Sequence, residues 1–209
     1  GVFVEGSDVT DRVRAEEQQK LLLDELNHRV KNTLATVQSI AAQTLRTTPA
    51  PEAFKQAFES RLMALSSTHD LLTASSWRGA DLREILRAEF RPHGTERYRL
   101  EGPELGLSPA RALALGLLFH ELATNAAKYG ALSSPEGCVK VTWKIETEAG
   151  HDRLVITWTE ENGPEVVKPT RKGFGSRLIE RSLKGELGGE ATLDYRPDGI
   201  HCQVILPLT

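Results

Sequence analysis

Apolar residues between positions 21 and 46 recur in steps of three and four. This spacing predicts one long amphipathic helix, because such steps align side chains on one face at about 3.6 residues per turn. The charged residues from Asp11 to Lys20 lead into this helix, and Pro49 and Pro51 end it shortly after Arg46. The members of the apolar stripe are Leu23, Leu26, Val30, Leu34, Val37, Ala41 and Leu45.

A second periodic segment runs from about Glu52 to Ala74. Two long helices joined by a short proline-containing loop predict an antiparallel hairpin. Apolar surface left over on such a hairpin tends to pair with a second copy as a four-helix bundle. We therefore expect a homodimer, and a monomer remains open where the hairpin contacts are satisfied internally. The apolar positions of this segment are Phe54, Phe58, Leu62, Leu65, His69 and Leu72.

The pattern changes after Trp77. Helices are expected over residues 81–90, 109–129 and 176–187, the second one opened by a capping Ser108 and by Pro109. Strands are expected over residues 98–100, 139–147, 154–158, 191–195 and 200–206. The strands come as neighbouring pairs and do not alternate with helices. This order predicts an α+β fold, with an antiparallel or mixed sheet that carries helices on one face.

One histidine of the first helix is a candidate for chemistry. His28 lies two residues beyond Leu26, about 200° around the helix, so it faces away from the apolar stripe. Arg29 and Lys31 are its neighbours, and Asn32 at i+4 shares its face. An imidazole held out from a rigid helix could exchange a proton or a phosphoryl group. The alternative is a solvent-facing histidine on a surface helix.

The expected helix over 109–129 presents a mixed polar face near its end. Glu121, Asn125 and Lys128 fall at i, i+4 and i+7. An amide oxygen can ligate Mg²⁺, and an ammonium group can meet phosphate. A carboxylate can orient a metal-bound water or accept a proton. This set suits a nucleotide, and a solvated helix surface is the alternative.

An acidic turn follows the strand that ends at Trp158. Glu160 precedes the sequence Asn162-Gly163-Pro164, so a carboxylate stands at a strand end beside a glycine turn. Such a carboxylate can accept a hydrogen bond from an exocyclic amino group such as that of adenine. The alternative is an acidic surface turn.

A glycine-rich loop precedes the expected helix over 176–187. Gly173 and Gly175 would let the backbone approach phosphates just before a helix N-terminus, where unpaired N–H groups attract anions. Lys168, Arg171 and Lys172 add positive charge upstream. A GxG alone is weak evidence, and its place after the two other segments strengthens it.

The composition excludes several classes of protein. With 209 residues, 39% hydrophobic and 26% charged, the chain is an ordinary globular one. Its net charge of −3 argues against nucleic-acid binding, and no apolar run approaches the ~18 residues of a membrane span. Cys138 and Cys202 match no metal or redox spacing. The chain begins at Gly1 without a signal peptide, so we expect a cytoplasmic fragment of a longer protein.

Four stretches together resemble a known family. ELNHRVKN, HELATNAAKYGALS, WTEENGP and GFGSRLIERSLKGELGG are similar to the HWE histidine kinases of bacterial two-component signalling. The His, Trp and Glu of the family name correspond to His120, Trp158 and Glu160. The resemblance covers about residues 11–207. The opening GVFVEGSDVTDR is similar to the last strand of a PAS sensor domain and the start of a signalling helix.

The resemblance implies a division of the chain into three parts. Residues 1–12 would end a PAS-like sensor domain, and residues 13–77 would form a helical hairpin for dimerisation and histidine phosphotransfer. Residues 78–209 would form a Bergerat-type α/β sandwich that binds ATP and Mg²⁺. The linker near residues 75–79 would be the hinge between the last two.

The family's functional residues carry over to matching positions. His28 would be the phosphoacceptor, oriented by Glu25, and Asn125 would bind Mg²⁺ with the catalytic candidates Glu121 and Lys128 beside it. Glu160 stands where other sensor kinases place the Asp that reads adenine. The remaining nucleotide-contacting residues would be His120, Lys128, Tyr129, Trp158, Gly163, Lys172, Gly173, Phe174, Gly175 and Ser176.

One position departs from the family pattern. Asn162 stands where the related pattern has glycine, and Asn tolerates left-handed backbone geometry better than most residues. We therefore expect weakened or unchanged nucleotide binding.

The implied activity is autophosphorylation of His28 from ATP, followed by transfer to an aspartate of a response-regulator receiver domain. One alternative is a kinase-like binding module that docks a regulator. Another is a relative from the same ATPase superfamily that phosphorylates serine on a protein partner, although such relatives lack the long helix that carries His28.

Overall fold

The computed structural model describes residues 10–48, 50–148, 150–166, 183–184, 187–196 and 199–208. It divides into two compact units, Gly1–Ala42 and Gln43–Thr209. The expected PAS-like strand at the start of the chain and most of the expected helix over 176–187 lie outside the described residues.

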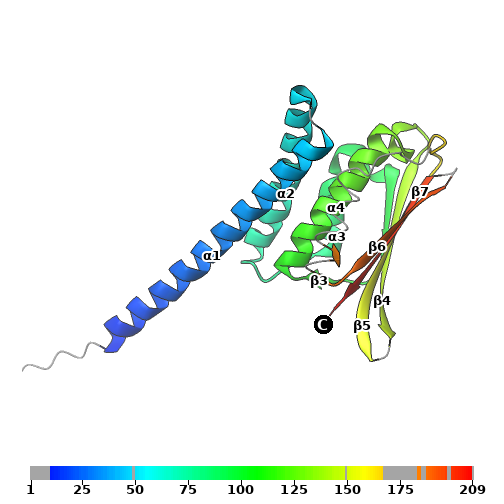
Figure 1. Ribbon diagram of the computed structural model, residues 1–209. Coiled ribbons are helices and arrows are strands. Elements are labelled where there is room, and N and C mark those ends of the chain that lie inside the picture. Colours follow the sequence, from blue (N-terminus) through cyan, green and yellow to red (C-terminus); the bar gives the residue numbers. More distant parts are fainter. Residues whose placement is uncertain are drawn as a thin grey trace, which may run out of the picture. The chain divides into compact units, whose positions relative to one another are not determined.

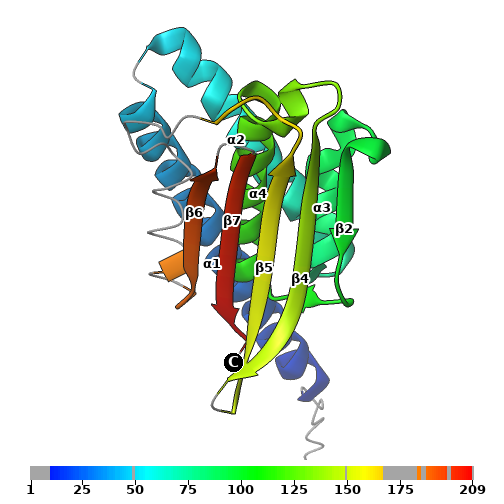
Figure 2. The same ribbon diagram turned by 90° about the vertical axis from the view of Figure 1, so that its right-hand side faces the viewer.

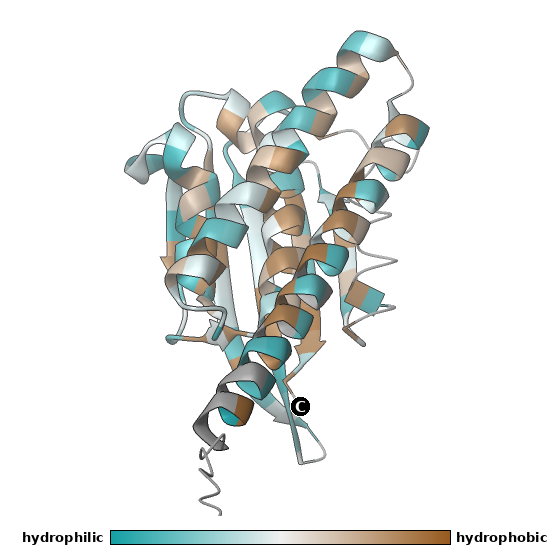
Figure 3. Ribbon diagram, turned by 90° about the vertical axis from the view of Figure 1, so that its left-hand side faces the viewer, coloured by the Kyte–Doolittle hydropathy of each residue, from teal (hydrophilic) through white to brown (hydrophobic). Residues whose placement is uncertain are grey.

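Helix α1 (Thr10–Thr47) is one continuous helix that ends just before Pro49, as the sequence predicts. Hydrophobic positions recur along its ribbon in Figure 3, with hydrophilic positions between them. Much of the apolar stripe is exposed to solvent in the single chain, which leaves it free to bind another apolar surface. The exposed stripe members are Leu23, Leu26, Val30, Leu34 and Leu45.

Three further helices belong to the second unit: α2 (Pro51–Ala74), α3 (Leu82–Phe90) and α4 (Pro109–Lys128). Asp81 caps α3, because its carboxylate accepts the backbone N–H groups of Arg83 and Glu84 at 2.8 and 3.3 Å. Ser108 occupies the N-cap position of α4, but its hydroxyl makes no cap hydrogen bond. The start of α4 was therefore predicted at the right residue, whereas the side-chain cap is wrong. Short 3-10 helices are η1 (Arg91–His93), η2 (Thr95–Arg97) and η3 (Ala131–Ser133).

A five-stranded mixed sheet forms the other layer of the second unit, in the order β2-β4-β5-β7-β6 (Figure 2). β2 runs parallel to β4, and the other neighbours are antiparallel. The strands are β2 (Tyr98–Glu101), β4 (Cys138–Glu148), β5 (His151–Glu161), β6 (Glu190–Arg196) and β7 (Gly199–Pro207). The antiparallel pairs β4–β5 and β6–β7 confirm the predicted pairing of neighbouring strands.

A second, two-stranded sheet pairs β1 (Ala80–Asp81) with β3 (Gly106–Leu107) in antiparallel fashion. The sequence did not predict it, because strands of two residues carry no readable alternation.

The core lies between one face of the five-stranded sheet and helices α3 and α4, which cover that face in Figure 1. Val141, Trp158 and Cys202 are direct cross-strand neighbours on this face, and all three are buried. The adjacent row on the opposite face, Lys140, Thr159 and His201, is polar and half-buried. This alternation confirms the predicted α+β architecture with helices on one face of the sheet.

The link after α2 contains strained backbone. Ser76 and Trp77 adopt φ angles of 53° and 61°, in the left-handed region that residues other than glycine seldom occupy.

No helix within the described residues is both long and apolar enough to cross a bilayer.

Candidate active site

The end of α4 and the end of β5 meet at one corner of the second unit. The backbone N–H of Ala131, just after α4, donates to Glu160 Oε2 at 2.9 Å. The N–H groups of Tyr129 and Gly130 both donate to the carbonyl of Asn125, at 2.8 and 3.1 Å. Two of the three sequence segments that predict a nucleotide site are therefore brought together by hydrogen bonds.

Glu160 is held from two sides in this corner. Its side chain is nearly enclosed, with the residue only 2% exposed, and its Oε1 accepts the indole N–H of Trp158 at 3.3 Å. Burial raises the pKa of Glu160, while the hydrogen bonds from Ala131 and Trp158 act in the opposite direction. The result is a carboxylate with fixed orientation that keeps a free lone pair on each oxygen.

Glycines make room for this carboxylate. A Cβ atom on Gly130 would clash with Glu160 Oε2, and a Cβ on Gly163 would lie 2.8 Å from the Cα of Ala131. Both glycines are therefore required by the close packing of the acidic turn against η3. Asn162, directly before Gly163, has a φ of 57°, so the expected left-handed geometry at this residue is confirmed.

Asn125 and Lys128 keep their polar groups available. Asn125 is half-buried, and within the described residues its side-chain amide has no hydrogen-bond partner. Lys128 is exposed and forms no ion pair within the same residues, and Tyr129 is 73% exposed. An amide oxygen beside an ammonium suits a Mg²⁺ ion that keeps most of its waters and binds nucleotide phosphates. No group of three or more His, Cys, Asp or Glu that could hold a metal occurs in the described part of the chain.

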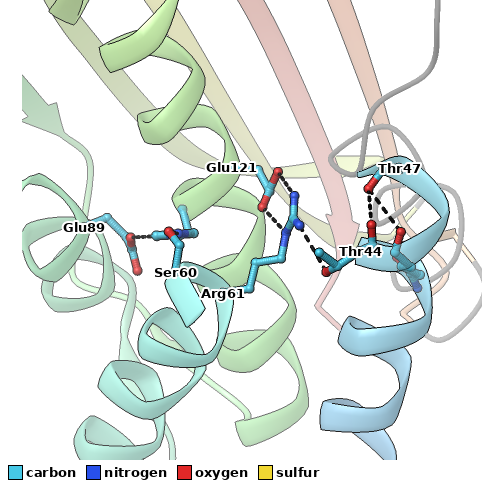
Figure 4. Close-up of polar contacts among 8 residues, drawn as sticks. Thr44, Thr47, Ser60, Arg61, Glu89 and Glu121 are labelled. Atoms are coloured by element: carbon cyan, nitrogen blue, oxygen red, sulfur yellow. Dashed lines mark hydrogen bonds and ion pairs between the residues drawn. The ribbon is translucent and has the colours of Figure 1, made fainter. Parts of the chain in front are cut away.

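Glu121 is engaged by the second helix. The guanidinium of Arg61 binds the Glu121 carboxylate in bidentate fashion, with Nε donating to Oε1 at 2.8 Å and Nη2 donating to Oε2 at 3.1 Å (Figure 4). Only 9% of the Arg61 side chain and 11% of the Glu121 side chain are exposed. Arg61 also donates from Nη1 to Thr44 Oγ1 at 3.1 Å. A carboxylate predicted to serve the nucleotide is thus tied to α2.

The side chain of His120 also contacts neighbouring helices. Its Nε2 lies 2.7 Å from Ser60 Oγ on α2, and its Nδ1 lies 2.9 Å from Glu89 Oε2 on α3. Figure 4 shows Ser60 and Glu89 on separate helices beside the Arg61–Glu121 pair. The chain Ser60–His120–Glu89 joins three helices.

Sequence reasoning missed these partners. One signal for Arg61 was available, because it falls three residues after Phe58 and four before Leu65, within the apolar face of its helix. A basic residue at such a position indicates a buried carboxylate partner. Ser60 and Glu89 carried no comparable signal.

Several predicted residues lie where the structure gives no side-chain description. The backbones of Glu25 and His28 are helical within α1, as expected, but their side chains are outside the described residues. The whole glycine-rich loop segment 167–182 is also outside them, and it holds Lys168, Arg171, Lys172, Gly173, Phe174, Gly175 and Ser176. The functional roles given to all these residues stay predictions.

Comparison with known proteins finds relatives that are histidine kinases. Residues 25–104 match the family described as HWE histidine kinase. The chain is 42% identical over 97% of its length to blue-light-activated histidine kinases of Brucella ovis and of Brucella abortus (strain 2308). It spans 42% of the length of these relatives.

Two solved structures share the fold. The Erythrobacter litoralis EL346 blue-light activated histidine kinase matches with a TM-score of 0.55 at 21% identity, over 89% of this chain and 62% of that one. The histidine kinase domain of the same protein matches with a TM-score of 0.53 at 15% identity, over 83% of this chain and 94% of that one. The succession of helices and mixed sheet is therefore an arrangement already known in kinases.

Proposed function

The chain belongs to the HWE histidine kinases, and from that membership we propose that it is the catalytic core of a two-component sensor. In this proposal it phosphorylates its own His28 from ATP and passes the phosphoryl group to an aspartate of a response-regulator receiver domain. The corner where Ala131 donates to Glu160 carries the proposal, because it joins a buried carboxylate to the end of the helix that holds Asn125 and Lys128.

Each residue of the corner has a proposed task. Glu160 accepts a hydrogen bond from the purine amino group, and Lys128 meets phosphate. Asn125 would supply an oxygen ligand to Mg²⁺, and that ion would neutralise negative charge that develops during phosphoryl transfer. Lys172, Gly173, Phe174, Gly175 and Ser176 are proposed to contact the nucleotide.

The reaction requires an unprotonated ring nitrogen of His28 as the nucleophile. Its lone pair forms the N–P bond while the bond from the γ-phosphorus to the bridging oxygen breaks, and ADP leaves with that electron pair. The proton on the other ring nitrogen is released to a base, and Glu25, three residues earlier on α1, is proposed to orient the ring. Since Arg61 holds Glu121, the proposal gives that carboxylate no part in the proton transfer.

The three-part organisation remains part of this proposal. Residues 13–77 would supply the phosphotransfer hairpin, residues 78–209 the Bergerat-type ATP-binding part, and residues 1–12 the end of a PAS-like sensor. The linker near residues 75–79, in which Ser76 and Trp77 adopt left-handed φ angles, would be the hinge between the first two. The reaction would take place in the cytoplasm, where ATP and receiver domains meet.

Self-association is proposed through α1. Leu23, Leu26 and Leu34 are 50%, 56% and 56% exposed, and a second copy of the same helix is the partner with a matching apolar stripe. Light scattering over a dilution series should show a dimer that dissociates. A monomer at every concentration would contradict this part of the proposal only.

The central test is labelling from γ-labelled ATP. The wild-type chain should gain an acid-labile, base-stable label, and His28→Ala should abolish it, whereas the control His151→Ala, at the exposed start of β5, should leave it unchanged. Asn125→Ala should remove the Mg²⁺-dependent labelling. A label that survives in His28→Ala would move the acceptor elsewhere, and an acid-stable label would favour the serine-kinase alternative.

A further inference from the structure

Trp158 is assigned to nucleotide binding by family resemblance, but its position in the structure excludes a direct contact. The residue is 1% exposed, and its ring stacks on Phe90 with centroids 5.4 Å apart and planes at 18°. Phe90 in turn stacks on Tyr98 at 4.7 Å. The indole is therefore a core group, with only its N–H directed to a functional residue.

That N–H reaches Glu160 because of strand geometry. Residues two apart on a strand point to the same face, so the pattern Trp-x-Glu at the end of β5 places the indole beside the carboxylate. Trp158 Nε1 donates to Oε1 at 3.3 Å, and the N–H of Ala131 donates to Oε2 at 2.9 Å. One donor comes from the same strand and the other from η3, so the carboxylate is fixed at both oxygens.

A glutamate needs this fixing more than an aspartate would. Its extra methylene adds one rotatable bond, and an unheld carboxylate would lose side-chain entropy on meeting a purine. The same two donors oppose the effect of burial on the pKa of Glu160 and so favour the ionised form, which accepts from an amino group.

We propose that Trp158 is a positioning residue that sets purine selectivity by orienting Glu160, without touching the nucleotide. This inference rests on the proposed function, in which Glu160 reads the 6-amino group of ATP. Trp158 and Glu160 then act as one hydrogen-bonded unit, with the Ala131 N–H as its second anchor.

The test compares ATP with inosine triphosphate, which carries an oxygen in place of the 6-amino group. The wild-type chain should prefer ATP, and Trp158→Phe should reduce that preference about tenfold, the effect of losing one hydrogen bond to a charged group. Phenylalanine keeps an aromatic ring against Phe90 but removes the N–H. Dissociation constants from calorimetry give the ratio of the two affinities, which loss of general stability would not change.

The matched control is Trp143→Phe. Trp143 is also buried on the covered face of the sheet, and its Nε1 donates to the carbonyl of Pro103 at 2.8 Å. Its replacement loses an equivalent hydrogen bond that does not involve Glu160, so the preference for ATP should stay. In addition, Trp158→Phe should have no further effect on selectivity in a Glu160→Gln background, since the two residues act together.

Outcomes separate this inference from the function on which it rests. A wild-type chain that binds neither nucleotide overturns both. A wild-type chain that binds ATP but does not discriminate overturns the inference together with the purine-reading role of Glu160. A Trp158→Phe variant that retains the full preference overturns the inference alone. If Trp158→Phe fails to fold, indole N–H resonances of the wild type decide: with three tryptophans in the chain, that of Trp158 must shift on ATP binding, and an unchanged resonance refutes the inference.

Discussion

Arg61 provides the sharpest test of the packing between α2 and α4. In Arg61→Met, a side chain of similar length fills the space, but the Glu121 carboxylate stays buried without its partner. The structure shows at least three hydrogen bonds from the guanidinium, two of them to Glu121. Removing one partner of a buried, well-aligned pair costs about 3–5 kcal/mol. We expect the free energy of unfolding to fall by that amount.

The assay is urea unfolding followed by tryptophan fluorescence. The matched control is Arg87→Met on α3, because Arg87 Nη1 lies 2.7 Å from Glu84 Oε1 while their side chains are 55% and 51% exposed. Such an exposed pair contributes about 0–1 kcal/mol, so the control should unfold close to the wild type. The comparison isolates burial, since both variants lose an arginine that contacts a glutamate on a helix.

A double variant separates the two sources of the loss. Arg61→Met combined with Glu121→Met removes both charges, and replacing a buried pair with apolar groups of similar volume is often neutral or stabilising. We expect the double variant to recover most of the stability lost by Arg61→Met. An Arg61→Met variant no less stable than Arg87→Met, or a double variant as unstable as the single one, would refute the assignment of Arg61–Glu121 as a buried, interdependent pair.

Three further changes test the corner around Glu160. Gly130→Ala should lower the free energy of unfolding by about 1–3 kcal/mol, because the added Cβ would meet Glu160. The control Gly106→Ala has open space around the added Cβ and should be tolerated. Equal effects of the two substitutions on unfolding in urea would contradict this prediction. Asn162→Ala should lower the stability by about 1 kcal/mol because the φ of this residue is 57°, and Asn162→Gly should leave the stability unchanged. Melting temperatures would rank the two variants, and an alanine variant as stable as the wild type would contradict the prediction. Burial raises the folded-state pKa of Glu160, so its contribution to stability is full below the unfolded-state pKa and is lost as the pH rises through the folded-state pKa. Glu160→Gln should therefore gain stability relative to the wild type across that window, and parallel unfolding curves against pH would disprove it.

Much of the fold could be predicted because its signals are local. The expected helix from Glu52 is observed from Pro51, and the strand pairs after Gly137 and after Gly188 appear where alternation and turn residues placed them. The left-handed backbone at Asn162 was also predictable, since few residues other than Asn and Gly adopt it readily. These features depend on residues a few positions apart.

The partners of the site could not be predicted in the same way. Arg61 and Glu121 are 60 positions apart in the sequence, as are Ser60 and His120, and only the packing of α2 on α4 brings them together. Spacing along α4 correctly placed Glu121, Asn125 and Lys128 near one another, but it could not show that a guanidinium from another helix already binds the first of them. Which of two possible partners a side chain binds depends on tertiary contacts.

Helix α4 therefore takes part in two kinds of contact, one with neighbouring helices and one, in the proposed function, with a ligand. His120 and Glu121 are bound to α2 and α3, and over the next two turns Asn125 and Lys128 have no side-chain hydrogen bond or ion pair with the part of the chain that the structure describes. Where two binding events share one rigid element, thermodynamic reciprocity applies. Any strengthening of the α2–α4 contact by nucleotide must be matched by an equal strengthening of nucleotide binding when that contact is made.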